Sequence, residues 1–308
     1  MAGTFTHWMI ANQAMERFPV KTGPFATVQL NFPFVSLGAI GPDYPYLSEL
    51  LGGLLKEHSW ADRMHLENTG GFVASGVRNL AALPPQDRGV CTAFLFGFAT
   101  HLVADSVVHP IVNLAVRGLP LWNGAAHRDC EMTQDSWIFK KITNTEIGDS
   151  KYVDRLRMCS DPADLARIHP ALRSFWKKTL ADAHPAASKW VDRIDPDAWH
   201  RHVIEGMNLA AHPMPVLRHL GTALDLVYKP TASLDPEDRK RYVDQVRLPG
   251  GGLGRFEEDV FDRAVEKVVA VWQKLLPDAV AGTPDAVGAY LPDWDLDRGV
   301  DLDALCLW

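Results

Sequence analysis

Histidines and carboxylates at helical spacing are the residues of this 308-residue chain best suited to chemistry. His101, Asp105 and His109 follow one another at intervals of four within the segment AFLFGFATHLVADSVVHPIVN. Residues four apart lie on one face of an α-helix, one turn above another, so the three side chains form a column. Such converging groups are ligands for a metal ion such as zinc. Because the flanking residues are apolar, these groups would be costly to bury without a metal or another partner, and a buried hydrogen-bonded His–Asp pair is the alternative interpretation.

A second pair at the same spacing follows in HRDCE, where His127 and Glu131 are one helical turn apart. Pro110 disfavours helical geometry at the residue before it, so we expect His109 at the end of its helix. There it would serve a different ion from His101, and His127 and Glu131 would complete the ligands of that second ion. Asp135, one turn further on, is expected to be solvated, with a hydrogen bond to a ligand histidine as the alternative.

Further donors lie upstream of the column. His7 stands in FTHWMIAN at the start of the first expected helix. Asp43 follows a Gly-Pro turn in GAIGPDYP, which would project its carboxylate from a rigid loop. His58 and His65 stand at the two ends of HSWADRMH. Each residue alone is typical of a surface or capping role, so the prediction depends on the whole set.

The order of these donors resembles the zinc-dependent phospholipase C superfamily, which also contains the fungal single-strand-specific zinc nucleases. The resemblance covers roughly residues 1–145 and is greatest to the bacterial phospholipase C-like branch, in the GAIGPD turn and the GFATHLVADSVVHP segment. It implies an all-helical fold, three clustered zinc ions in a cleft and cleavage of phosphoester bonds.

The resemblance also implies roles for individual residues. His101 and Asp105 would bind the first zinc together with the histidine that precedes a helix. We prefer His65 for that histidine, because LENTGGFVASGV leads from it directly into a helix, and His58 is the alternative. Asp43 would lie at the same ion as a ligand or as the general base.

By the same resemblance, His109, His127 and Glu131 would hold a second zinc. Asp105 would bridge to a third, completed by His7 and the chain's own amino terminus. In the secreted members of the family that terminus is a tryptophan, and two more residues separate the equivalents of Asp105 and His109. Here the chain begins Met-Ala, so Ala2 is a replacement ligand if Met1 is removed, and otherwise the third site is altered.

Composition limits the other functions. The formal charge is −7, from 31 basic and 38 acidic residues, which gives no broad basic surface for nucleic acid and little support for a nuclease. The four cysteines are far apart and form no metal-binding CxxC pair, so we expect buried free thiols. The N-terminus shows no basic segment followed by an apolar one, from which we expect a cytoplasmic protein.

Helical periodicity dominates the chain, so we expect an all-α multi-helix bundle. The expected helices are roughly 6–17, 70–83, 87–108, 124–141, 163–181, 196–210, 214–227, 235–246 and 255–275. Residues 27–37 are the best strand candidate, although Pro33 weakens it. The apolar run 93–108 contains ionisable groups and is shorter than about twenty residues, so it predicts a buried core helix and not a membrane span.

We expect one helical domain over 1–280, with a metal-binding part at 1–145 and a helical cap at 146–280, followed by an acidic, partly irregular tail at 281–308. The predicted function is a zinc-dependent hydrolase that cleaves phosphoester bonds of a small, phospholipid-like substrate through a metal-activated water in a di- or trinuclear zinc cluster. The alternatives are a single-strand nuclease, or a diverged helical protein that keeps the metal site for binding or other chemistry.

Overall fold

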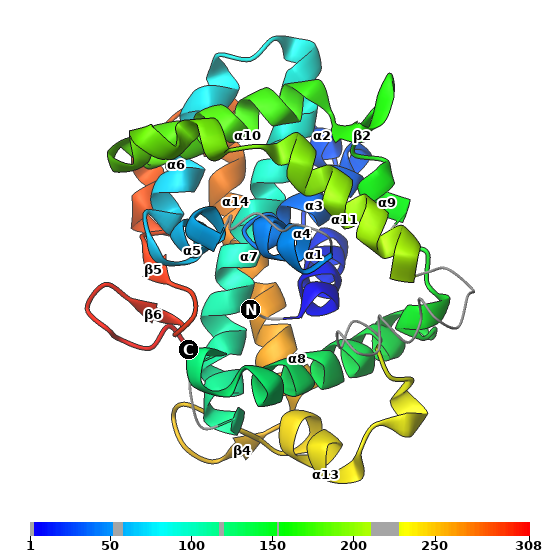
Figure 1. The fold of residues 1–308 in the computed structure, drawn as a ribbon. Helices are drawn as coiled ribbons and strands as arrows, with labels where there is room; N and C mark the ends of the chain where they lie inside the picture. The colour runs from blue at the N-terminus through cyan, green and yellow to red at the C-terminus, as the bar shows by residue number, and fades with distance from the viewer. Residues whose placement is uncertain (1–2, 52–57, 117–119, 153, 211–227) are drawn as a thin grey trace.

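The computed structural model describes residues 3–51, 58–116, 120–152, 154–210 and 228–308, and these form an all-helical protein (Figure 1). The α-helices are α1 (Thr4–Arg17), α2 (Pro24–Leu30), α3 (Phe32–Gly38), α4 (Tyr44–Leu51), α5 (His58–Leu66), α6 (Thr69–Ala81), α7 (Pro85–Val116), α8 (Pro120–Thr143), α9 (Asp154–Arg157), α10 (Pro170–Ala183), α11 (Pro196–Ala210), α13 (Pro236–Arg239) and α14 (Asp262–Ala281). The fold class predicted from helical periodicity is confirmed.

Short elements connect these helices. The 3-10 and π turns are η1 (Ile147–Asp149), η2 (Pro185–Arg193), η3 (Thr231–Ser233), η4 (Lys240–Asp244), η5 (Phe256–Phe261) and η6 (Pro284–Ala289). The strands are β1 (Ser160–Asp161), β2 (Asp164–Ile168), β3 (Val246–Arg247), β4 (Leu253–Gly254), β5 (Trp294–Asp295) and β6 (Val300–Asp301). They pair only as antiparallel neighbours, β1 with β2, β3 with β4 and β5 with β6.

Helix α7 runs through the centre of the molecule, where α1, α2, α3, α6, α8, α10 and α14 all pack on it (Figure 1). It is the one described helix long and apolar enough to cross a membrane, but 89% of its apolar window is buried inside the protein. Its hydrophobicity is therefore used for packing, and the prediction of a buried core helix is confirmed.

Two glycines let α3 lie unusually close to α7. A Cβ atom on Gly38 would come within 2.1 Å of the Phe94 carbonyl oxygen, and one on Gly97 within 2.1 Å of the Val35 carbonyl oxygen. Only a residue without a side chain fits at these two backbone contacts. This close crossing places the end of α3 and the turn that follows it against the middle of α7.

The strand expected at 27–37 is wrong, since these residues belong to α2 and α3. Pro24 and Pro33 stand in the first turns of these helices, where the missing N–H is not needed. Consecutive residues of α3 from Phe34 to Gly38 are buried on all sides, so the apparent alternation of apolar residues had no exposed face to match.

The helix end expected before Pro110 is also wrong, because α7 continues to Val116. A proline inside a helix removes one hydrogen bond and costs about 3 kcal/mol or more. Pro110 is fully surrounded by protein, and the turn at Gly299 packs against its ring, so burial offsets that cost. His109 consequently keeps its helical position on α7.

The bounds of other helices also differ from those expected from the sequence. The helix expected at 163–181 begins only at Pro170, because residues 164–168 form strand β2 of the β1–β2 hairpin. The expected helix 235–246 is α13 continued by the π turn η4, and 255–275 is η5 continued by α14. The expected helix 214–227 lies outside the described residues. All four cysteines are free, with Cys91, Cys130 and Cys159 buried and Cys306 exposed.

Candidate metal centre

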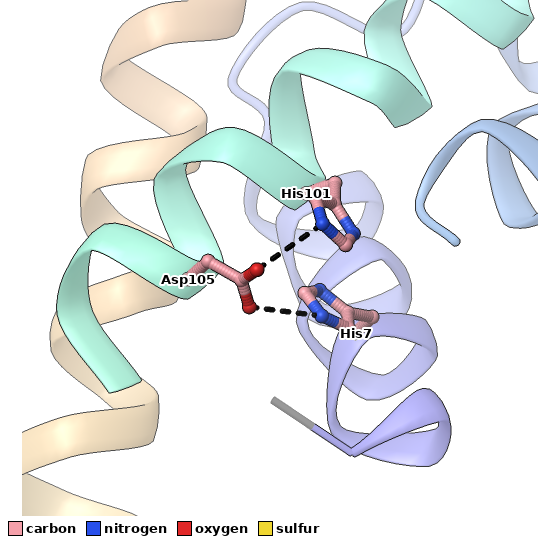
Figure 2. A group of neighbouring side chains, drawn as sticks. All are labelled: His7, His101 and Asp105. Carbon is pink, nitrogen blue, oxygen red and sulfur yellow. Dashed lines mark ion pairs between the residues drawn. The ribbon is translucent and has the colours of Figure 1, made fainter. Parts of the chain in front are cut away.

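Five buried side chains from four parts of the fold converge beside the middle of α7. They are His7 of α1, Asp43 of the turn before α4, His65 of α5, and His101 and Asp105 of α7, each at most 1% exposed. Their potential ligand atoms form two groups of three, His7–His101–Asp105 and Asp43–His65–His101, within which all atoms lie within 4.8 Å of one another. Figure 2 shows the first group, in which both rings face the carboxylate.

Asp105 lies at the centre of four imidazoles. Its Oδ1 is 3.2 Å from His7 Nε2 and 3.6 Å from His109 Nε2. Its Oδ2 is 3.1 Å from His101 Nε2 and 3.8 Å from His65 Nε2. Burial alone would raise the pKa of Asp105, but the facing histidines hold it well below its ordinary value. Since the two oxygens face different rings, this carboxylate has the arrangement that a bridge between two ions needs.

Asp43 faces the other side of the same cluster. Its Oδ1 lies 3.1 Å from His65 Nε2 and its Oδ2 lies 4.0 Å from His101 Nδ1. The preceding turn holds it in place, with the Tyr44 N–H donating to the Gly41 carbonyl at 3.1 Å. Despite the opposing effect of burial, His101 and His65 keep the pKa of Asp43 below its ordinary value, so the carboxylate stays ionised.

Backbone carbonyls fix the orientation of three histidines. The Nδ1 atom of His65 lies 2.8 Å from the Ala61 carbonyl oxygen, and that of His101 lies 3.0 Å from the Ala39 carbonyl oxygen. His109 Nδ1 makes the same kind of bond to the Leu296 carbonyl. A carbonyl only accepts, so each Nδ1 carries the hydrogen and each Nε2 presents a lone pair to the cluster. Metal-bound histidines are held in this way.

The Nε2 atoms of His65 and His101 lie only 3.3 Å apart. With both Nδ1 atoms protonated, two lone pairs face each other, and a cation or a proton must lie between them. Asp43 raises the pKa of His65 to about 9, against the effect of burial, so without metal His65 Nε2 can hold a proton that it shares with Asp43 at 3.1 Å. His7 adds a buried Nδ1 without a hydrogen bond to any described residue. This set of donors and charges fits zinc.

The second predicted ligand set is less compact. His127 Nδ1 lies 3.0 Å from Glu131 Oε1, and the His127 ring meets the His109 ring edge-on at 5.9 Å between centroids. The Nε2 atoms of His109 and His127 are buried and make no hydrogen bond within the described chain. The fold thus brings the three residues to one side of Asp105, but they are absent from both compact ligand groups. A second zinc at this place stays a prediction.

Of the two histidines proposed to partner His101, His65 occupies the place beside Asp43. His58 begins α5, and its side chain lies outside the described part of the structure. Residues 1–2 are also outside it, so of the predicted third site only His7, facing Asp105, is described.

Sequence reasoning missed the role of Asp135. It is neither solvated nor bonded to a histidine, because it is fully buried and accepts the N–H groups of Phe5 at 3.1 Å and Thr6 at 2.6 Å. The Tyr228 hydroxyl donates to it at 2.8 Å. Burial raises the pKa of Asp135 to about 6 although these donors lower it. The absence of a capping side chain at the start of α1 was the available signal, since its first N–H groups need an acceptor.

Fold and site together define an all-helical protein with a buried cluster of histidines and carboxylates that could hold a metal ion. The family model described as zinc dependent phospholipase C matches residues 6–186, which is more than half of the chain. The chain belongs to the zinc-dependent phospholipase C family. The match includes every candidate ligand from His7 to Glu131. The search of curated proteins and the search of solved structures each found no match.

Proposed function

We propose that this protein hydrolyses phosphoester bonds of a small, phospholipid-like substrate with zinc held at the described cluster. The observation that carries the proposal is the pair of imidazole Nε2 atoms facing each other at 3.3 Å between two ionised carboxylates. Two ionised carboxylates in a buried site need positive charge beside them, and zinc bound by the imidazole Nε2 atoms supplies it. Membership of the zinc-dependent phospholipase C family supports the reaction class.

The residues divide into holding and reacting groups. His7, His65, His101 and Asp105 would hold zinc, which when bound lowers the pKa of water and neutralises the charge of a phosphoester. Asp43 is ionised and lies beside this set, so we propose that it accepts the proton of the attacking water. His109, His127 and Glu131 would hold a further ion on the other side of Asp105.

The test is a substrate panel with zinc-loaded protein. Choline and ethanolamine phosphodiesters, phosphomonoesters and single-stranded DNA are each supplied. Release of the phosphomonoester from the diesters, release of phosphate from the monoesters and cleavage of the DNA strand are measured. We expect hydrolysis of a phosphodiester that chelator treatment abolishes. Failure of the fully metallated protein on all phosphoesters would refute the proposal, and cleavage of DNA alone would favour the nuclease alternative.

Asp43→Asn distinguishes between Asp43 as the proton acceptor and Asp43 as a zinc ligand. It removes the proton acceptor, so we expect kcat to fall about 10²- to 10⁴-fold while zinc content stays near that of the wild type. Loss of zinc together with activity would make Asp43 a ligand instead. Asp149→Asn, on the surface in η1, is the matched control and should leave both quantities unchanged.

A further inference from the structure

The tail after α14 reaches the candidate metal centre through the backbone N–H and C=O groups of one residue, Leu296. The Leu296 N–H donates to the His65 carbonyl at 2.9 Å, and the Leu296 carbonyl accepts the Nδ1–H of His109. Leu296 is fully buried, so water does not compete for either bond. One residue of the tail therefore contacts the candidate ligands of two different helices, α5 and α7.

Contacts on both sides hold this peptide in place. Before it, Thr69 Oγ1 accepts the Trp294 N–H at 2.7 Å and lies 3.3 Å from the Trp294 carbonyl oxygen. After it, Asn113 Nδ2 donates to the Asp297 carbonyl at 2.9 Å. Trp294 and Asp297 thus fix the tail to α6 and α7 within two residues of Leu296.

Close backbone packing adds to these bonds. A Cβ on Gly70 would come within 2.0 Å of the Leu291 carbonyl oxygen, and one on Gly299 within 2.4 Å of Pro110 Cδ. Gly299 also has a φ of +62°, which favours glycine. The tail is therefore seated on α6 and α7 at van der Waals contact, with no room for a side chain at either point.

The end of the chain closes over the same segment. The Leu307 N–H donates to the Gly299 carbonyl at 3.0 Å, and the Arg263 guanidinium of α14 lies 4.7 Å from the Trp308 ring centroid. The β5–β6 pair joins Trp294 to Asp301 and Asp295 to Val300, on either side of Gly299. Figure 1 shows this red segment returning to α5 and α7.

We infer that the tail segment 291–299 is a positioning element of the metal centre, in which the Leu296 peptide sets the tautomer of His109 and the place of His65. The inference rests on the proposed metal site. The family match ends at residue 186, so this element lies outside the matched region. A fixed Nδ1–H on His109 leaves Nε2 as the ligand atom, and without the carbonyl that preference is lost.

The test uses Thr69, which touches the tail and is not a candidate ligand. Thr69→Val keeps the shape but loses both bonds to Trp294, whereas Thr69→Ser keeps the hydroxyl. Zinc affinity of the full chain is measured by competition with a chelator, and the His109 tautomer by ¹⁵N NMR of the imidazole. Changes around metal-bound histidines typically weaken metal binding about 10- to 100-fold, and we expect a loss in this range for Thr69→Val and rescue by Thr69→Ser.

A second pair of variants tests whether misfolding explains a loss of zinc affinity. Gly299→Ala should displace the tail from Pro110, whereas Gly288→Ala in η6 meets no atom within 4 Å and is the control. Thermal unfolding of the metal-free variants reports folding separately from zinc affinity. Zinc affinity within twofold of the wild type in both Thr69→Val and Gly299→Ala would overturn the inference. Inactivity of a protein that binds zinc normally would instead contradict only the proposed function.

Discussion

Asp105 is the residue on which most of the described site depends. Its two oxygens face His7, His101, His65 and His109, all at 3.8 Å or less, inside a fully buried environment. An ionised carboxylate here supplies the charge that zinc needs and orients the rings around it. Removing that charge should weaken zinc binding.

We therefore expect Asp105→Asn to lose most of the bound zinc, because an amide is neutral and offers one acceptor oxygen in place of two. Elemental analysis after dialysis measures the loss. Asp87→Asn, in the first turn of the same helix, is the matched control and should keep the wild-type zinc content. Wild-type zinc content in Asp105→Asn would contradict the central role of this carboxylate.

At the scale of elements, the crossing of α3 and α7 positions His101. The Ala39 carbonyl accepts a hydrogen bond from His101, and Ala39 follows directly after α3. Helix α3 packs on α7 through Gly38 and Gly97. The site therefore depends on a helix contact that contains no candidate ligand. A change in helix separation moves the acceptor away from the imidazole.

Gly97→Ala is the corresponding prediction. The new methyl group would meet the Val35 carbonyl, and overpacking of this kind costs about 1–3 kcal/mol. Chemical denaturation should show this loss, and chelator competition should show weaker zinc binding. Gly124→Ala in α8 meets no atom within 4 Å and should leave zinc binding unchanged. If the Gly97 variant were as stable as that control, the crossing would not be as tight as described.

The elements also show where sequence reasoning succeeded. The column on α7 was readable because helical periodicity is local, and residues four apart must share a face. The strand at 27–37 and the end before Pro110 were wrong for one reason. In both places packing against α7 or the tail outweighed a local preference that the sequence displays.

At the scale of the whole molecule, His200 connects distant parts of the chain. Its Nδ1 lies 2.9 Å from the Tyr44 hydroxyl of α4, and its Nε2 lies 2.8 Å from Ser160 Oγ of β1. Burial lowers the pKa of His200 to about 4. Tyr44 follows Asp43 directly, so this buried contact also supports the loop of the metal centre.

Acid should therefore destabilise the protein through His200. Its pKa is about 6.5 in the unfolded chain and about 4 in the folded one, so below pH 6.5 the unfolded state binds a proton that the folded state does not. Stability is present above pH 6.5 and falls as the pH drops toward 4, by roughly 3 kcal/mol in all.

Thermal unfolding of metal-free protein between pH 7 and 4 measures this effect. We expect His200→Asn to lose less stability over that range than the wild type. Equal acid sensitivity of the His200 variant and the wild type would show that the imidazole is not held neutral in the fold.

The sequence by itself determined the all-helical class, the central helix and the column of His101 and Asp105, because residue type and helical spacing are local properties. His7, Asp43 and His65 became candidates only through the resemblance to a known family. Only the tertiary structure decided how the donors meet, since the distances between α1, α5 and α7 depend on packing. It alone also revealed the carbonyls of Ala39, Ala61 and Leu296 as partners of the histidines. Every residue carries a carbonyl, so no sequence pattern can indicate which of them faces an imidazole.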